Sequence, residues 1–372
     1  MRVLFSCGDF FPNLGGVTSL VDDLTRMLRR SGHEVSVLTR RWPGMVAKEV
    51  HNGYEILRLD YPVLFEDVEW NLGLLTRSPG ILRSLYRLLR ERRIEVVCIG
   101  LLDTSAFYLL LLKLILRFKV VLYLHGSDTR VLPRTFPNYR RVLQWALTSA
   151  EVILPVSEEL GREAAVFAPS AAPKMQVTPN GIDVQALLAT LAFEWPRPYV
   201  AFVGRLVREK DVDTLIEAFD AAAPALGDVD LLIAGKGREG DRLAAKARGL
   251  ASANRIHFLG LLPREQCWSV IRGSQLVALP SRTEGHPIVA LEARVAGKPL
   301  LGSDIPGIAR VIEHGRTGML FPQGDVAALA DLFRTYLTDA RALAELTAGA
   351  DAADKSAWGL GTELEDVLLS LR

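Results

Sequence analysis

YVAFVGRLVREKDVDTLIEAF, residues 199–219, is the stretch that decides the fold of this 372-residue chain. YVAFVG is a short apolar run that ends at a glycine, which is typical of a buried parallel strand. A charged loop follows, and DVDTLIEAF then carries apolar residues at the spacing of an amphipathic helix. Similar pairs of apolar runs and helical segments recur along the chain, and this alternation predicts βα units built around parallel sheets.

The βα series occurs twice, so we predict an α/β fold with two Rossmann-like parallel-sheet domains. Predicted strands of the first half are RVLFSCG (2–8), EVSVLT (34–39), VVCIG (96–100), VVLYLHG (120–126) and VILPVS (152–157), with helices over 16–31 and 78–93. Those of the second half are YVAFVG (199–204), VDLLIAG (229–235), RIHFLG (255–260), LVALPS (276–281) and KPLLGS (298–303). We expect domains over 1–183 and 199–355, a linker over 184–198 and a closing segment over 356–372.

Composition narrows the function classes. The chain has 44 Lys and Arg against 43 Asp and Glu, and 49% of its residues are hydrophobic, which argues against disorder and against nucleic acid as a main partner. The N-terminus lacks the apolar core of a signal peptide, and charges interrupt the longest apolar stretch, so we expect a cytoplasmic protein. The three cysteines, which we expect to be buried structural thiols, are Cys7, Cys98 and Cys267.

Two loops carry groups suited to phosphate. Gly15 and Gly16 precede an apolar-periodic helix, whose first backbone N–H groups would bind an anion, although such a pair is often only a tight turn. Arg205 and Lys210 flank the loop after the YVAFVG strand, where they form either a diphosphate clamp or a solvated basic loop. The nominal D-x-D pair Asp211 and Asp213, in the first turn of the following helix, is expected to cap that helix and not to bind a metal.

SRTEGHPIVALEA, residues 281–293, places two carboxylates around the start of a helix. Gly285 makes the turn and Pro287 suits the first helical position. Glu284 then lies in the loop at the carboxyl end of a strand, and Glu292 lies inside the helix. Carboxylates accept paired hydrogen bonds from vicinal hydroxyls of a sugar or ribose. The alternative is an ordinary loop glutamate and a surface helical one.

HGSD, residues 125–128, follows a predicted buried strand of the first half. His125 at the carboxyl end of that strand is a functional candidate, although a lone histidine is often structural. Asp128 fits a helix cap equally well.

In this order and spacing the motifs resemble the retaining GT-B glycosyltransferases of family 4, the glycosyl transferases group 1. The resemblance spans most of the chain and rests on GGV, HGSD, VSEEL, VTPNGID, FVGRLVREKDVDTLIEAF, LLIAGKG, IHFLG, LPSRTEGHPIVALEA and SAWGLG. It implies two domains that face each other across a central cleft, with the C-terminal helix crossing back to the N-terminal, acceptor-binding domain. It also implies transfer of a sugar from a UDP- or GDP-sugar to a hydroxyl of a glycan, glycolipid or lipid-linked intermediate in envelope or exopolysaccharide synthesis, with no metal or other cofactor.

The resemblance also implies roles by matching position. Arg205 and Lys210 would clamp the diphosphate and Glu292 would bind the ribose hydroxyls. Glu284 would lie beside the transferred sugar and His125 beside its reacting carbon. The implied catalytic set is His125, Glu284, Arg205 and Lys210. The implied donor-binding set contains Gly15, Gly16, Arg205, Lys210, Gly260, Glu284, Gly285, His286, Pro287, Ile288 and Glu292, and Asp128 and Asn180 are implied acceptor-binding or supporting residues.

Three positions depart from the family pattern. Asp211 stands where family members often have glycine, and Arg310 stands where a glutamate is frequent. Pro287 removes a backbone donor beside the sugar. These departures lie in the implied donor site, so they concern the identity of the donor and not the class of reaction.

The acceptor is not specified by the sequence. RRWPGMVAKEVHNGYEI (40–56) and LFEDVEWNLGLL (64–75), in the half expected to bind it, match no familiar motif. The helix over 79–93 is basic with an apolar face, so it would either lie on anionic lipid at the inner face of the cell membrane or simply pack on the sheet.

Two other functions fit a two-domain sugar-nucleotide fold. A GT-B-type sugar-nucleotide epimerase would react with the donor alone, and a non-catalytic sugar-binding protein would not need cations and a histidine in one site. A nicotinamide enzyme is a weak alternative, because the chain lacks the G-x-G-x-x-G fingerprint after its first strand.

Overall fold

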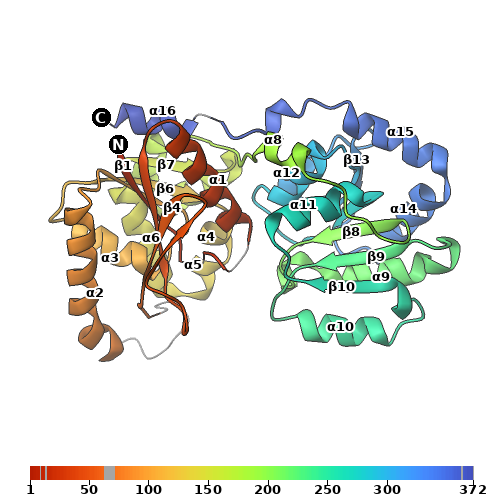
Figure 1. The fold of residues 1–372 in the computed structure, drawn as a ribbon, viewed down its shortest axis with the longest axis horizontal. Coiled ribbons are helices and arrows are strands. Elements are labelled where there is room, and N and C mark those ends of the chain that lie inside the picture. The colour runs from red at the N-terminus through yellow and green to blue at the C-terminus, as the bar shows by residue number, and fades with distance from the viewer. Residues whose placement is uncertain (9, 13–14, 63–71, 362, 372) are drawn as a thin grey trace. The chain divides into compact units, whose positions relative to one another are not determined.

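The chain divides into two compact units in this computed structural model, which describes residues 1–8, 10–12, 15–62, 72–361 and 363–371. Unit 1 consists of Met1–Asn13, Val17–Pro179 and Gly361–Arg372, and unit 2 consists of Leu14–Gly16 and Asn180–Leu360. Each unit is a parallel sheet with helices packed on it (Figure 1), so the predicted α/β class with two Rossmann-like sheets is confirmed.

The sheet of unit 1 has the strand order β3-β4-β2-β1-β5-β6-β7, and every neighbouring pair except β3 with β4 is parallel. Its strands are β1 (Arg2–Ser6), β2 (Glu34–Arg40), β3 (Lys48–His51), β4 (Tyr54–Leu59), β5 (Val96–Ile99), β6 (Lys119–Leu124) and β7 (Val152–Pro155). Its helices are α1 (Gly16–Arg30), α2 (Leu72–Glu91), α3 (Thr104–Lys113), α4 (Ser127–Arg130), α5 (Leu132–Thr135), α6 (Pro137–Ser149), α7 (Glu158–Phe167) and α16 (Glu363–Ser370), with a 3-10 turn at Pro169–Lys174.

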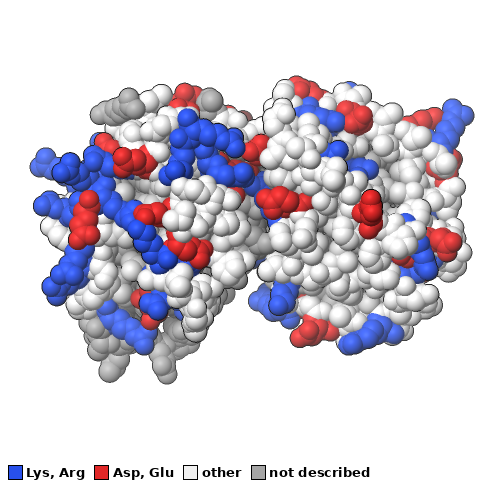
Figure 2. Space-filling view, in the orientation of Figure 1, with Lys and Arg blue, Asp and Glu red and all other residues white. Residues whose placement is uncertain are grey.

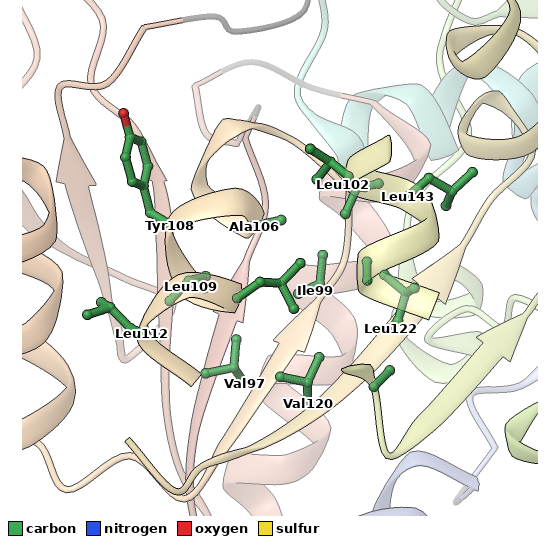
Figure 3. Close-up of a cluster of buried hydrophobic side chains, with 14 of the residues drawn as sticks. Val97, Ile99, Leu102, Ala106, Tyr108, Leu109, Leu112, Val120, Leu122 and Leu143 are labelled. Carbon is green, nitrogen blue, oxygen red and sulfur yellow. The ribbon is translucent and has the colours of Figure 1, made fainter. Parts of the chain in front are cut away.

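A core of unit 1 lies between this sheet and the helices α2, α3 and α6, and Figure 3 shows part of it. Alternate residues of a strand share one face, and residues three apart share one face of a helix, so short apolar runs suffice to build this layer. The labelled side chains include Val97 and Ile99 of β5, Val120 and Leu122 of β6, Leu109 and Leu112 of α3, and Leu143 of α6. Burial of each large aliphatic side chain stabilises the fold by roughly 1.5–3 kcal/mol.

The sequence did not predict the hairpin of β3 and β4. Asn52 and Gly53 link the two strands with positive φ angles of 46° and 81°. An Asn-Gly pair with both residues at positive φ is the strongest short-range signal for a two-residue hairpin. This segment falls within RRWPGMVAKEVHNGYEI, whereas residues 64–71 of LFEDVEWNLGLL lie outside the described residues.

The sheet of unit 2 has the order β10-β9-β8-β11-β12-β13 and is parallel throughout. Its strands are β8 (Tyr199–Val203), β9 (Asp230–Ala234), β10 (Ile256–Gly260), β11 (Leu276–Leu279), β12 (Leu300–Ser303) and β13 (Gly318–Phe321). Its helices are α8 (Val184–Ala189), α9 (Val212–Ala222), α10 (Gly240–Arg248), α11 (Arg264–Gly273), α12 (Ile288–Val295), α13 (Pro306–Ala309), α14 (Val326–Thr338) and α15 (Ala340–Asp351). Short 3-10 turns lie at Arg208–Lys210, Ala223–Ala225, Ala253–Arg255 and Ser356–Trp358.

Most predicted elements of both units are present. The predicted helix over 16–31 is α1, whereas the one predicted over 78–93 begins earlier, at Leu72, with Pro79 inside it. The edge strand β13 was not predicted. Two cysteines are buried as expected, but Cys267 is only partly buried, and all three are free thiols. Within the described residues no helix is long and apolar enough to cross a membrane.

Candidate functional site

In unit 2 the strand order reverses between β8 and β11, and open α/β sheets bind their ligands at such a point, beyond the carboxyl ends of the strands. The two strands are paired, so the loops that follow them lie side by side. Lys210 follows β8 and Glu284 follows β11, and Lys210 Nζ lies 2.5 Å from Glu284 Oε1. The backbone N–H of Arg282 also donates to the carbonyl of Glu209 at 2.8 Å. Two implied donor-site residues are therefore brought together.

Asp211 makes a second link between these loops. Its backbone has φ 47° and ψ 44°, the left-handed region that glycine adopts most easily and aspartate tolerates. This conformation is the physical reason that glycine suits the position. Its carboxylate accepts a hydrogen bond of 3.0 Å from Arg282 Nη2 and is almost fully buried.

Asp211 and Asp213 lie at the start of α9 as predicted, but the expected cap by the side chain of Asp211 is wrong. Asp211 occupies the N-cap position of α9, but its side chain makes no capping hydrogen bond, because it points instead to Arg282. Asp213 lies in the first turn and pairs with Arg242 and Lys246 of α10. Hydrogen bonds, foremost from Arg242, lower the pKa of Asp213 to about 2, which keeps this carboxylate ionised.

The remaining cation and glycines of the implied donor site also lie at loop or helix ends. Arg205 follows β8, is exposed, and makes no ion pair with any part of the chain that the structure describes. Gly260 ends β10 with φ 72°. Gly15 immediately precedes α1 and Gly16 is its first residue, so both adjoin backbone N–H groups that have no partner within the helix. These positions are suited to an anionic ligand.

His286 is buried between the glycine turn at Gly285 and the start of α12. Its Nδ1 accepts a hydrogen bond of 3.2 Å from the backbone N–H of Asn180, and the Asn180 amide donates to the His286 carbonyl at 2.8 Å. Burial, reinforced by the positive charge of Arg310, lowers the pKa of His286 to about 4. This histidine is therefore neutral at ordinary pH.

Pro287 and Ile288 lie at the start of α12. Pro287 was expected at the first helical position, but it lies one residue before that position. It is the N-cap, with an extended backbone (φ −72°, ψ 118°), and Ile288 is the first helical residue. The missing N–H of Pro287 therefore falls just outside the helix.

Glu292 lies in α12 and is only 6% exposed. Its Oε1 accepts a hydrogen bond of 2.7 Å from Trp268 Nε1 and lies 3.9 Å from Arg264 Nε. The sequence reading missed both partners. Arg264 and Trp268 both lie in α11, and their spacing of four residues places them on one face of that helix. This spacing is the sequence signal that could have indicated them.

In unit 1 the candidate residues follow β6. The Asp128 carboxylate accepts hydrogen bonds from the backbone N–H of His125 at 2.9 Å and from the Tyr139 hydroxyl at 3.0 Å, so Asp128 braces this loop from within α4. The imidazole of His125 stacks on Tyr123, with ring centroids 5.9 Å apart. Burial lowers the pKa of His125, although the Asp128 charge and a hydrogen bond with the backbone of Gly100 act in the opposite direction.

Asp103 follows β5 at the same edge and was also missed. Its carboxylate accepts hydrogen bonds from Ser105 and Ala106 at the start of α3 and from the Tyr61 hydroxyl at 3.0 Å. Gly8, after β1, approaches it so closely that a Cβ there would lie 2.3 Å from Asp103 Oδ2. An aspartate followed by Thr-Ser directly after a predicted strand is a helix-capping signature, and that signal would have found it.

Metal-ligand geometry is not present in the part of the chain that the structure describes, where no three His, Cys, Asp or Glu side chains are grouped to hold an ion. The charged residues of the implied donor site in unit 2 are the cations Arg205 and Lys210 and the carboxylates Glu284 and Glu292. This set can bind a ligand that carries both phosphates and hydroxyls.

Both halves of the chain match known families of glycosyltransferases. The family described as Glycosyltransferase Family 4 matches residues 14–186, and the family described as Glycosyl transferases group 1 matches residues 187–352. The GDP-mannose-dependent monoacylated alpha-(1-6)-phosphatidylinositol monomannoside mannosyltransferase of Corynebacterium glutamicum is 27% identical over 99% of this chain and 98% of its own length. The alpha-D-kanosaminyltransferase of Streptomyces kanamyceticus is 29% identical, over 94% and 98%.

A solved structure supports the fold. HepE from Anabaena in complex with UDP-glucose superposes with a TM-score of 0.78 at 18% identity, over 100% of this chain and 99% of that one.

Proposed function

Because this chain belongs to the GT-B glycosyltransferases of group 1 and family 4 and depends on a nucleotide sugar, we propose that it is a retaining enzyme that glycosylates a glycan, glycolipid or lipid-linked acceptor. Its donor is a GDP- or UDP-sugar and no metal takes part. The observation that carries the proposal is the edge of unit 2, where the loop after β8 carries the exposed Arg205 and also Lys210, which pairs with Glu284.

The cations hold the donor diphosphate in this proposal. Arg205 offers a planar fork to phosphate oxygens, and Lys210 offers a point charge that the diphosphate shares with Glu284. Negative charge grows on the diphosphate as the bond to the sugar breaks, so fixed positive charge beside it favours the transition state over the ground state. Glu284 then accepts hydrogen bonds from the transferred sugar, and Glu292 from the ribose.

His125 orients a hydroxyl rather than carrying charge. Its lowered pKa keeps the ring neutral, and among the described residues its Nε2 is buried without a hydrogen-bond partner. A sugar hydroxyl satisfies that nitrogen. The departing diphosphate takes the proton of the acceptor hydroxyl, so the enzyme needs no separate charged base on the acceptor side.

The acceptor proposal rests on the named relatives. One acts on a phosphatidylinositol monomannoside with GDP-mannose, which favours GDP-mannose and a lipid-linked acceptor as the first pair to test. The bound UDP-glucose of HepE keeps a UDP-sugar as the second donor.

We also propose that the protein works in the cytoplasm and that residues 79–93 contact anionic lipid at the inner face of the membrane. Ile81, Leu85 and Leu89 of this segment are buried in the core of unit 1, whereas Arg83 and Arg87 are exposed. Figure 2 shows Lys and Arg gathered along the side of unit 1 on which α2 lies. The contact is therefore electrostatic and weakens with salt, because the apolar face is already used for packing.

The decisive experiment is a binding and turnover panel in the presence of EDTA. Calorimetry with GDP, UDP, ADP and their sugars is compared for wild type, Arg205→Ala and Glu292→Gln, and for Arg208→Ala as a control at an exposed neighbouring arginine. We expect one diphosphonucleotide to bind wild type and Arg208→Ala similarly and to bind the other two variants at least 10-fold more weakly. The anomeric configuration of the product is then read by NMR.

Three outcomes would contradict parts of the proposal. If no nucleotide binds wild type, the donor assignment is wrong. A requirement for Mg²⁺ after EDTA treatment would overturn the metal-free mechanism. Conversion of the nucleotide sugar without an acceptor would favour the epimerase alternative.

A further inference from the structure

Glu292 is a buried carboxylate, and its partners among the described residues include Trp268 and Arg264. Burial of a carboxylate costs several kcal/mol unless hydrogen bonds and an opposite charge compensate. The indole N–H of Trp268 supplies a hydrogen bond of 2.7 Å to Oε1, and Trp268 itself is only 2% exposed. The rigid indole therefore fixes the position of one carboxylate oxygen.

Arg264 completes the arrangement. Its guanidinium carbon lies 4.4 Å from the centre of the Trp268 ring, and its Nε lies 3.9 Å from Glu292 Oε1. With 8% of its surface exposed, Arg264 is itself buried, so its charge acts on Glu292 with little screening by water. Residues 264 and 268 lie one turn apart on α11, which directs both side chains to α12.

We propose that Trp268 and Arg264 are positioning residues that hold Glu292 for the ribose and so make the protein select ribonucleoside over deoxyribonucleoside diphosphates. This inference rests on the proposed function. A carboxylate held in one direction accepts hydrogen bonds from vicinal ribose hydroxyls, and a deoxy analogue leaves part of that buried acceptor unmatched. A carboxylate free to rotate would turn away and lose this discrimination.

The chain contains a matched control. Trp195 Nε1 donates a hydrogen bond of 2.8 Å to Asp230 Oδ2, and Asp230 is 3% exposed. Asp230 is the first residue of β9, at the amino end of the strand and so at the edge of the sheet opposite to the predicted ligand edge. Trp195 and Asp230 therefore form the same kind of indole–carboxylate hydrogen bond as Trp268 and Glu292, but away from the predicted ligand edge.

The test compares the binding of GDP with 2′-deoxy-GDP and 3′-deoxy-GDP, and of UDP with its two deoxy analogues, to wild type, Trp268→Phe and Trp195→Phe. We expect wild type and Trp195→Phe to prefer the ribonucleotide by roughly 10- to 100-fold. In Trp268→Phe the preference falls to within about 3-fold, while the diphosphate is still bound. Arg264→Met, which keeps the stem of the side chain on the indole, is the second variant and should also lose the preference, and it decides the question if Trp268→Phe does not fold.

The inference is overturned if either folded variant of the pair keeps the wild-type preference, or if Trp195→Phe loses it equally. Wild type that binds a diphosphonucleotide without preferring ribose overturns this inference and leaves the glycosyltransferase proposal intact. Wild type that binds no nucleotide at all overturns the proposed donor site as well.

Discussion

The two units use the same kind of sheet edge in different ways. In unit 2 full charges of opposite sign join the loops after β8 and β11, through Lys210 with Glu284 and Arg282 with Asp211. At the edge of unit 1 the carboxylates of Asp103 and Asp128, which follow β5 and β6, accept hydrogen bonds from hydroxyls and backbone N–H groups, and the ion pairs there join Arg130 of α4 to Glu159 and Glu163 of α7. A shared topology therefore carries two electrostatic environments.

Burial shifts the pKa of several groups beside Asp103 and Asp128 in unit 1. Burial raises the pKa of Asp103 and of Tyr139, and it lowers the pKa of His125. Burial thus favours the uncharged form of each group, which suits an uncharged hydroxyl compound, whereas the exposed cation and the paired charges of unit 2 suit an anion. The same kind of sheet therefore carries different side chains on its loops in the two units, and a fold by itself does not specify a ligand.

The largest effect is expected for Lys210→Ala, which tests whether the charges at the edge of unit 2 serve an anionic ligand. The substitution removes the cation that we propose to contact the donor diphosphate, and it leaves Glu284 without the charge that lies 2.5 Å away. We expect kcat/KM with the correct donor to fall by about 100- to 1,000-fold, the cost of losing one group that stabilises developing charge. Steady-state kinetics measure it.

Lys246→Ala is the matched control, because Lys246 also pairs with carboxylates, Asp213 and Glu217, but on the surface of α9 and α10. Its activity should stay within about 3-fold of wild type, since surface ion pairs contribute little. A similar loss in both variants would mean that unit 2 uses its charges only for stability.

A smaller effect concerns His286, the neutral group within the charged edge. Its pKa falls from an ordinary 6.5 to about 4, mainly through burial. Between these pH values the unfolded chain binds a proton at this residue and the folded chain does not, so stability falls as pH falls from about 6.5 to 4 and the loss is complete below pH 4. In His286→Asn this loss should shrink by up to about 3 kcal/mol, as measured by denaturant unfolding across that pH range.

His314→Asn serves as the control for this pH effect. His314 Nδ1 also accepts a backbone N–H, from Leu320 at 3.0 Å, but the side chain is exposed. Its variant should keep the wild-type dependence on pH between 4 and 6.5. An unchanged pH dependence in His286→Asn would show that His286 does not remain neutral in the folded protein.

The smallest expected effect is that of Asp128→Asn in unit 1. The His125 N–H and the Tyr139 hydroxyl donate to different oxygens of the carboxylate, and in the amide one of these oxygens is replaced by an NH2 group, which cannot accept. We expect a loss of about 1–3 kcal/mol in the free energy of unfolding, measured with urea. Asp325→Asn at the N-cap of α14 should change it little, because asparagine caps a helix about as well as aspartate. Equal losses of unfolding free energy in Asp128→Asn and Asp325→Asn would show that Asp128 stabilises the protein no more than an ordinary helix cap does.

Local patterns in the sequence were enough to predict much of the fold and part of the candidate site. The strands β8 and β11 are continuous apolar runs, and the helix that carries Glu292 follows a glycine turn. The prediction succeeded there because buried parallel strands and amphipathic helices are encoded in short windows. The edge strand β3 was missed because Lys48–His51 contain no apolar run. β13 was missed although Met, Leu and Phe follow each other in it, because so short an apolar run does not by itself distinguish a strand from a helix.

The sequence by itself determined the two βα series, the positions of the loops and the kinds of side chain they carry. Only the tertiary structure decided which of those side chains meet: Lys210 with Glu284, Asn180 with His286, and Trp268 with Glu292. The partners are 74, 106 and 24 residues apart. The physical reason is that spacing along the chain specifies the face of one helix or strand, whereas contacts between loops depend on which strands become neighbours in the sheet.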